Sequence, residues 1–322
     1  MIILVESWYY LMHKRRKRYR KKYNTIIGIF LLAALPIMAV GYGAFSANIN
    51  LGVKGNVKEK ILINEYITSL YNSNEQTLID DNTSDHNIRY SGKDVNNYIC
   101  LANENPCSEN NLYRVIGVFN NIKSNENSVG ETRTKIIRAN VLFQSAFDDA
   151  NSVNWSIPTS LNVKLNSSAL ANNKLIDNTF WTLGQCWIGI TSNASYESEK
   201  GTPTWTGKIA LMYQSDYGFA SKSCYKTKKL WAPDTENDDY RNNECINSNW
   251  LFNTSTEPEW TLVRGTREGR VNAISTAGAI IDSAFAVPTE KNNVRPVAFL
   301  KSSISILKNG NNGSKNKPYV VA

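Results

Sequence analysis

Between Ile26 and Phe45, twenty residues follow one another without a charged side chain. About 20 consecutive apolar residues in a helix are enough to cross the hydrocarbon layer of a bilayer. Pro36 and the glycines in this stretch are compatible with a spanning helix, because neighbouring groups can satisfy the freed backbone. The sequence therefore predicts a transmembrane helix over residues 24–46 that contacts the lipid bilayer through residues 26–45.

Eight basic residues stand directly before this stretch, between Lys14 and Lys22. With Glu6 they account for +7 of the net charge of +8, so everything after Tyr23 carries about +1. Lys and Arg beside a membrane segment stay on the cytoplasmic side. We therefore interpret residues 1–23 as a cytoplasmic tail that orients the helix, with the C-terminal part outside the cell, and predict no nucleic-acid partner.

A cleaved signal sequence is the alternative interpretation of the same segment. Ala44 and Ser46 are small residues at the positions that a signal peptidase requires before Ala47. The apolar stretch exceeds the 7–15 residues usual in signal peptides, which favours an uncleaved anchor. Translation from Met12 instead of Met1 is also open, because MHKRRKRYRKK begins there.

The five cysteines all follow the apolar stretch, as expected for a domain in an oxidising compartment. Cys100 and Cys107 lie close enough in sequence to close a hairpin, and Cys224 with Cys245 forms the natural second pair. Cys186 is left over, and its neighbours favour a buried thiol that behaves as a small apolar residue. No CxxC motif occurs, which removes support for a zinc ribbon.

Residues 47–87 are expected to form a stalk strand, a helix and a polar linker. The helix is predicted from apolar residues at a helical spacing, and the linker from NEQTLIDDNTSDHN, which has no apolar period. The expected apolar stripe consists of Ile63, Tyr66, Ile67, Leu70 and Tyr71.

Residues 88–322 are expected to form an extracellular α+β domain with a mainly antiparallel sheet and long irregular loops. Runs at 89–101, 111–122 and 134–143 are rich in β-branched and aromatic residues and predict an antiparallel meander. Helices are expected over 156–170 and 174–183.

The rest of this domain is expected to contain fewer regular elements. Residues 208–220 should form a strand that runs into a turn, within a long irregular region between Trp181 and Trp260. One strand is expected over 293–307, followed by a glycine-rich turn and a short final strand.

Several segments, in this order, carry a resemblance to a known family: NNYIC, NLYRVIGVF, KIIRANVLF, WTGKIALMYQSDYGFA, NWLFNTSTEPEWTLV, VRPVAFLKSSISI and NGSKNKPYVV. Over residues 88–321 the chain resembles an uncharacterised family of exported, membrane-anchored surface proteins of Gram-positive and mollicute-related gut bacteria. The resemblance implies a cell-surface location and leaves the activity open.

The C-terminal part of the chain is similar to the C-terminal half of C-type-lectin-like folds of the formylglycine-generating-enzyme group. The similarity lies in EWTLV, the loop with Arg264 and Arg270, and NVRPVAFL. That resemblance implies a C-type-lectin-like arrangement. Enzymes of that group use two active-site cysteines late in the chain, and no cysteine follows Cys245 here. The absence of this late cysteine pair argues against formylglycine-generating activity.

No catalytic residue is predicted. His86 is the one histidine outside the basic tail and lies in polar TSDHN, where a solvated side chain is expected. The phosphate-binding patterns GxGxxG and GxxxxGK[ST] do not occur, and no cofactor or metal is predicted. Arg295, flanked by Val294 and Pro296, would need a carboxylate or carbonyl partner if buried.

Ligand-binding candidates come from two polar loops. Aromatic faces in such loops can bind a glycan or a peptide, and neighbouring carboxylates supply polar contacts. The candidates are Trp205, Trp231, Asp234, Asp238 and Asp239.

These patterns lead to the prediction of a membrane-anchored cell-surface protein, not an enzyme, whose outer domain binds an extracellular glycan or protein or contributes to the cell envelope. An exported enzyme related to the formylglycine-generating group and a structural envelope or appendage component are the alternatives. The last would use the strand after the membrane to pair with a neighbour.

Overall fold

The computed structural model describes residues 59–156, 159–166, 180–188, 204–221, 243–265, 268–308 and 310–322, with only the backbone of 243 and 282–285. They belong to one compact unit, Lys58–Ala322. The predicted tail (1–23) and membrane helix (24–46) lie outside these ranges. Within the described ranges, no helix combines the length and the apolar character needed to span a bilayer.

The first described elements are strand β1 (Glu59–Leu62) and helix α2 (Ile63–Asn72). Ile63 and Ile67 are buried, and the other members of the predicted apolar stripe pack against the same core. The helix predicted from apolar spacing is therefore confirmed. β1 pairs antiparallel with β15 (Ser305–Lys308) and belongs to the compact unit, so the first residues of the predicted helical segment form a strand. The predicted stalk strand before them lies outside the described residues.

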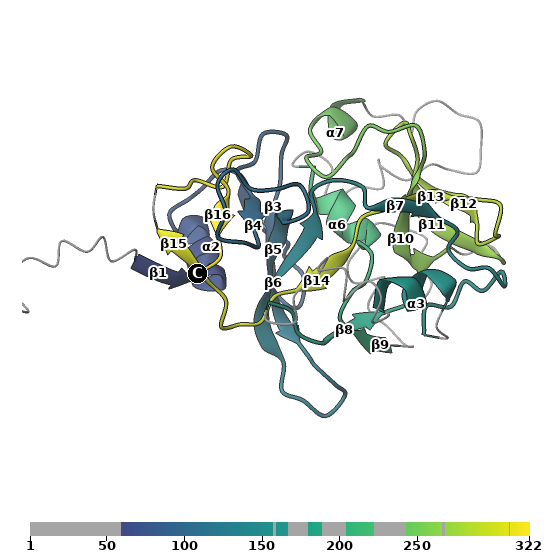
Figure 1. Cartoon of the computed structure of the whole chain (residues 1–322), viewed down its shortest axis with the longest axis horizontal. Coiled ribbons are helices and arrows are strands. Elements are labelled where there is room, and N and C mark those ends of the chain that lie inside the picture. Colours follow the sequence, from purple (N-terminus) through teal and green to yellow (C-terminus); the bar gives the residue numbers. More distant parts are fainter. Residues whose placement is uncertain are drawn as a thin grey trace, which may run out of the picture. The chain divides into compact units, whose positions relative to one another are not determined.

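A seven-stranded sheet follows (Figure 1). The expected meander is present, since β5 pairs antiparallel with both β4 and β6. A Cβ on Gly117 of β5 would lie 2.1 Å from the Ile88 carbonyl oxygen, so glycine allows β3 to approach β5. The strands are β2 (Leu78–Asp80), β3 (Ile88–Tyr90), β4 (Tyr98–Cys100), β5 (Leu112–Ile122), β6 (Glu131–Arg138), β14 (Val297–Phe299) and β16 (Tyr319–Val320).

A five-stranded sheet has the order β12-β11-β10-β13-β7. Its pairs are antiparallel except for the parallel contact of β10 with β13. The strands are β7 (Phe143–Ser145), β10 (Glu259–Arg264), β11 (Arg270–Ile274), β12 (Ile280–Phe285) and β13 (Asn292–Val294).

Three short helices and a small hairpin complete the described fold. They are α3 (Ser160–Asn166), α6 (Gln214–Phe219), α7 (Asn243–Asn247) and the pair β8 (Gly184–Trp187) with β9 (Thr204–Gly207). α3 confirms the helix expected from Leu161 and Leu165, which are both buried. α6 lies between the two large sheets in Figure 1. This places Asp216 of α6 beside charged residues of the seven-stranded sheet.

Three expectations differ from the structure. The strand expected in 208–220 is reduced to a β-bridge of Ala210 with Val297, and residues 214–219 form α6 instead of a turn. Residues 293–307 contribute to β13, β14 and β15, which belong to three sheets, and Pro296 separates β13 from β14. The described part of 174–183 is not helical, since Trp181 forms a β-bridge with Leu300. Overall the described chain is a mainly β-sheet domain with a few short helices.

Candidate functional site

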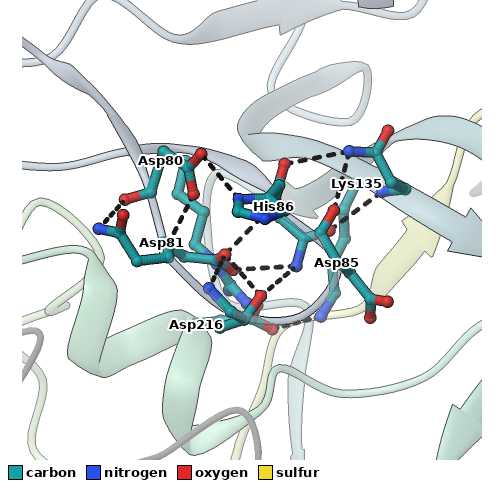
Figure 2. A network of polar contacts seen from close by, with 11 residues as sticks. Asp80, Asp81, Asp85, His86, Lys135 and Asp216 are labelled. Carbon is teal, nitrogen blue, oxygen red and sulfur yellow. Dashed lines mark hydrogen bonds and ion pairs between the residues drawn. The ribbon is translucent and has the colours of Figure 1, made fainter.

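Four charged side chains meet inside the domain. Arg89 Nε lies 2.8 Å from Asp81 Oδ2, and Arg89 Nη1 lies 2.9 Å from Asp216 Oδ1. Lys135 Nζ donates to the other oxygen of Asp216. All four residues are at most 4% exposed. These contacts join four parts of the fold at one point, namely strands β3 and β6, helix α6 and the loop after β2 (Figure 2).

The loop after β2 folds around the Asp81 carboxylate. Asp81 Oδ1 accepts hydrogen bonds from both the backbone and the hydroxyl of Thr83 and from the backbone of Asn87. Asn87 Nδ2 and Arg89 Nε donate to the other oxygen. Burial raises the pKa of Asp81, but the Arg89 charge and these hydrogen bonds outweigh burial and lower the pKa overall. The segment expected to be a polar linker thus contains strand β2 and a turn in which Asp81, Thr83 and Asn87 are buried.

Aromatic rings surround the two buried cations. The Arg89 guanidinium carbon lies 4.5 Å from the ring centroids of both Phe119 and Phe219. Lys135 Nζ lies 4.4 Å from the centroid of Tyr213. Cation–π contact of this kind is strongest where water is excluded. Because the four charges sum to zero and each is paired, this network is a cross-link between elements and offers no unpaired charge for chemistry.

A small cavity lies against this network. It is lined by Lys135, Cys186 and Tyr213, and its volume of about 10 Å³ is at the lower limit for a single water molecule. It is therefore too small for an organic ligand. Cys186 is buried, and burial raises the pKa of its thiol to about 11. The thiol is protonated near pH 7, which agrees with the predicted apolar role and disfavours a thiolate nucleophile.

A larger open groove of about 460 Å³ lies at the junction of α2 and β2. Its volume is in the range of ligand-binding clefts. Amide and carboxylate side chains dominate its lining, and one aromatic ring, Tyr71, joins them. The lining residues are Tyr71, Asn72, Asn74, Glu75, Gln76, Leu78 and Ile79.

The structure places Trp205 differently from its expected position in a polar loop. It lies in β9, packs against the core, and its ring centroid is 5.9 Å from that of Trp155. It is half-buried because its ring packs against the core. The other candidates, Trp231, Asp234, Asp238 and Asp239, lie outside the described residues.

The described cysteines agree with the predicted pattern. Cys100 and Cys107 form a disulfide with a Cα–Cα distance of 5.9 Å. Cys245 is also disulfide-bonded, and Cys224 lies outside the described ranges. Among the described residues, Cys100, Glu104 and Cys107 are the one group with the spacing of metal ligands. Because both thiols are consumed by the disulfide, only the Glu104 carboxylate is left, and a metal site is disfavoured.

Arg295 illustrates a sequence signal for buried ion pairs, namely a charged residue that is flanked by apolar residues. As expected of a charge flanked by apolar residues, it is buried and bonded to the Glu259 carboxylate and the Leu251 carbonyl. Lys135 precedes Ile136 and Ile137, and Arg89 lies between Ile88 and Tyr90. The same signal could therefore have identified the network.

No protein-family model, curated protein or solved structure matches this chain. The function is accordingly inferred from the sequence and the geometry of the domain.

Proposed function

We propose that this is a membrane-anchored cell-surface protein whose outer domain binds an extracellular ligand, with a glycan as the favoured class. The groove at the junction of α2 and β2 carries the ligand-binding part of the proposal. Its amide side chains suit the hydroxyl groups of a saccharide, and Tyr71 supplies an aromatic surface.

The cell-surface location is supported by the order of the chain. A basic run, an apolar span and a domain with disulfides at Cys100–Cys107 and Cys245 follow one another. Disulfides persist outside the reducing cytosol. Protease treatment of intact cells tests the orientation, since an outside domain is cleaved while a cytoplasmic control protein survives. Survival of the domain under conditions that cleave it in lysed cells would contradict the proposal.

Ligand binding is tested with the full chain in detergent on a glycan array. Asn72→Trp places a bulky ring in the groove and should abolish the binding of any captured glycan. Asn127→Trp is the matched control, because Asn127 is also exposed and lies on the β5–β6 hairpin, outside the groove. Capture of no glycan by the wild-type protein, or equal capture by both variants, would count against the groove.

A structural envelope component is the second candidate, and the pairing of β1 favours it. Among the described strands, β1 pairs with β15 alone, so its other edge can accept a strand from a neighbouring molecule. Crosslinking in cells separates the two roles, since a structural component gives a ladder of oligomers. A C-type-lectin-like arrangement of the C-terminal half remains part of the proposal, and an experimental structure tests it.

A further inference from the structure

We propose that Arg114 and Arg295 form a binding site for a small oxyanion, meaning a carboxylate, sulfate or phosphate group. The two side chains donate to the adjacent backbone carbonyls of Trp250 and Leu251. Both guanidinium groups are thereby anchored to the same short stretch of backbone, at Trp250 and Leu251. The site shares no residue with the groove at α2 and does not depend on the function proposed above.

Arg114 is rigidly held. Its Nε donates to Asn97 Oδ1 at 2.8 Å, and its Nη1 donates to the Trp250 carbonyl at 2.8 Å. The guanidinium carbon lies 4.5 Å from the ring centroid of Tyr98 and 4.3 Å from that of Trp250. A guanidinium fixed between two rings is preorganised, so little side-chain entropy is lost when an anion binds.

Arg295 is also held by two hydrogen bonds. Its Nε lies 2.8 Å from Glu259 Oε1, and its Nη2 donates to the Leu251 carbonyl at 2.7 Å. Within the described part of the chain, Arg114 Nη2 and Arg295 Nη1 make no hydrogen bond. Neither of these two nitrogen atoms is among the fully buried side-chain atoms that lack a hydrogen-bond partner. Each arginine therefore keeps one terminal NH₂ group for an acceptor.

The charge balance distinguishes this cluster from the network around Arg89. The Arg89 network has two cations and two carboxylates, whereas here Glu259 pairs with Arg295 alone, and both printed hydrogen bonds of Arg114 go to neutral oxygens of Asn97 and Trp250. A partly buried positive charge without a carboxylate is costly. An anion at this position would remove that cost.

The direction of the pKa shifts agrees with an excess of positive charge. Burial lowers the pKa of Arg114 to about 10, Tyr98 opposes the shift, and the Arg295 charge adds to it. Burial also raises the pKa of Glu259, although Arg295 acts in the opposite direction. The one compensating carboxylate is thus itself poorly stabilised as an anion.

The chemistry of two planar guanidinium groups selects the ligand class. Arginine NH₂ groups pair with the oxygens of carboxylate, sulfate and phosphate through charge-assisted hydrogen bonds. A single chloride or a neutral saccharide lacks several oxygens on one centre, so it should bind more weakly. The natural source is either a free inorganic anion or an acidic group on a larger molecule.

Titration of the full chain in detergent with sodium sulfate, phosphate and glucuronate tests the site, with chloride keeping the ionic strength constant. Saturable binding, followed by calorimetry and by the thermal midpoint, is expected for at least one of the three. A preference for glucuronate indicates an acidic saccharide, and a preference for sulfate or phosphate indicates the inorganic anion.

Arg114→Gln should lower the affinity by about tenfold or more, because it removes a hydrogen bond between charged groups. Arg114→Lys keeps the charge but loses the planar fork, and should also weaken binding. Lys308→Gln removes the same charge from an exposed pair and should leave the affinity unchanged.

Absence of saturable binding to the wild-type protein would overturn the proposal. So would an equal loss in Lys308→Gln and Arg114→Gln, because the effect would then reflect net charge. If Arg114→Gln does not fold, the proposal is tested by comparing the anion affinity of the wild-type protein with that of Arg114→Lys. Binding of sulfate without capture of any glycan would refute only the function proposed for the groove.

Discussion

Asp216 is the residue on which the buried network depends, because it pairs with both cations. Asp216→Asn leaves Arg89 and Lys135 with the single carboxylate of Asp81. We expect a loss of about 3–5 kcal/mol in the free energy of unfolding, measured by urea denaturation. Asp80→Asn is the control, since Asp80 pairs with the exposed His86 and should change stability by less than about 1 kcal/mol. Equal losses in the two variants would contradict this assignment.

Asp81 should make the stability of the domain dependent on pH. Its pKa is lower in the folded state, so its contribution is present above the unfolded value of about 4 and is lost as pH falls through the folded pKa. The stability difference between the wild-type protein and Asp81→Asn should therefore stay constant from about pH 7 to pH 5 and shrink as the pH falls below about 4. Urea midpoints across that range measure it, and a constant difference would contradict the expectation.

Cys186 should be unreactive until the domain unfolds. Burial raises the pKa of its thiol to about 11, so the thiolate that reacts with an aromatic disulfide reagent is scarce near pH 8. We expect slow labelling of the native protein and rapid labelling in denaturant. Cys186→Ala should abolish both signals, and fast labelling of the native wild-type protein would disprove burial of the thiol.

The disulfide that closes the loop after β4 should stabilise the C-terminal end of the domain. Cys100 pairs with Val320 of β16 and packs with Leu307 of β15. With a sequence separation of 7, loop-closure entropy predicts a loss of about 2.5 kcal/mol in the double variant Cys100→Ser/Cys107→Ser. Urea unfolding measures the loss, and Cys186→Ala serves as a control that breaks no disulfide and buries no hydroxyl.

The elements that the sequence predicted well have strong local signals. α2 follows from an apolar stripe, and the β4–β5–β6 meander follows from β-branched runs. α6 could not be predicted, because its six residues are too few for a helical period and long-range contacts decide their conformation. The distribution of 293–307 over three sheets is also a tertiary property, since strand partners are not encoded in the run itself.

The candidate groups were only partly predictable. Arg295 was identified because a charge between apolar residues needs a partner, although the identity of Glu259 as that partner required the fold. The position of Trp205 in a strand was not predicted, because its polar neighbours suggested a loop and concealed the packing of its ring against Trp155. The groove at 71–79 has no sequence signal, because its lining comes from the end of α2, the turn that follows and β2, which only the fold brings together.

The compact unit that begins at Lys58 should fold without the preceding residues. We expect a protein comprising residues 58–322, oxidised at its disulfides, to unfold cooperatively at a thermal midpoint within a few degrees of the full chain. Calorimetry of the two proteins in the same detergent measures this. A much lower midpoint would show that the first 57 residues contribute to the domain.

The pairing of β1 with β15 joins Glu59 to Lys308, which are 249 positions apart in the chain. During synthesis the first strand of the domain therefore has no partner until nearly every other residue has been added. Closing so distant a pair is slow, and an unpaired edge is open to wrong partners while it waits. Nascent molecules interrupted before β15 should accordingly be the species most dependent on chaperones and most prone to aggregate.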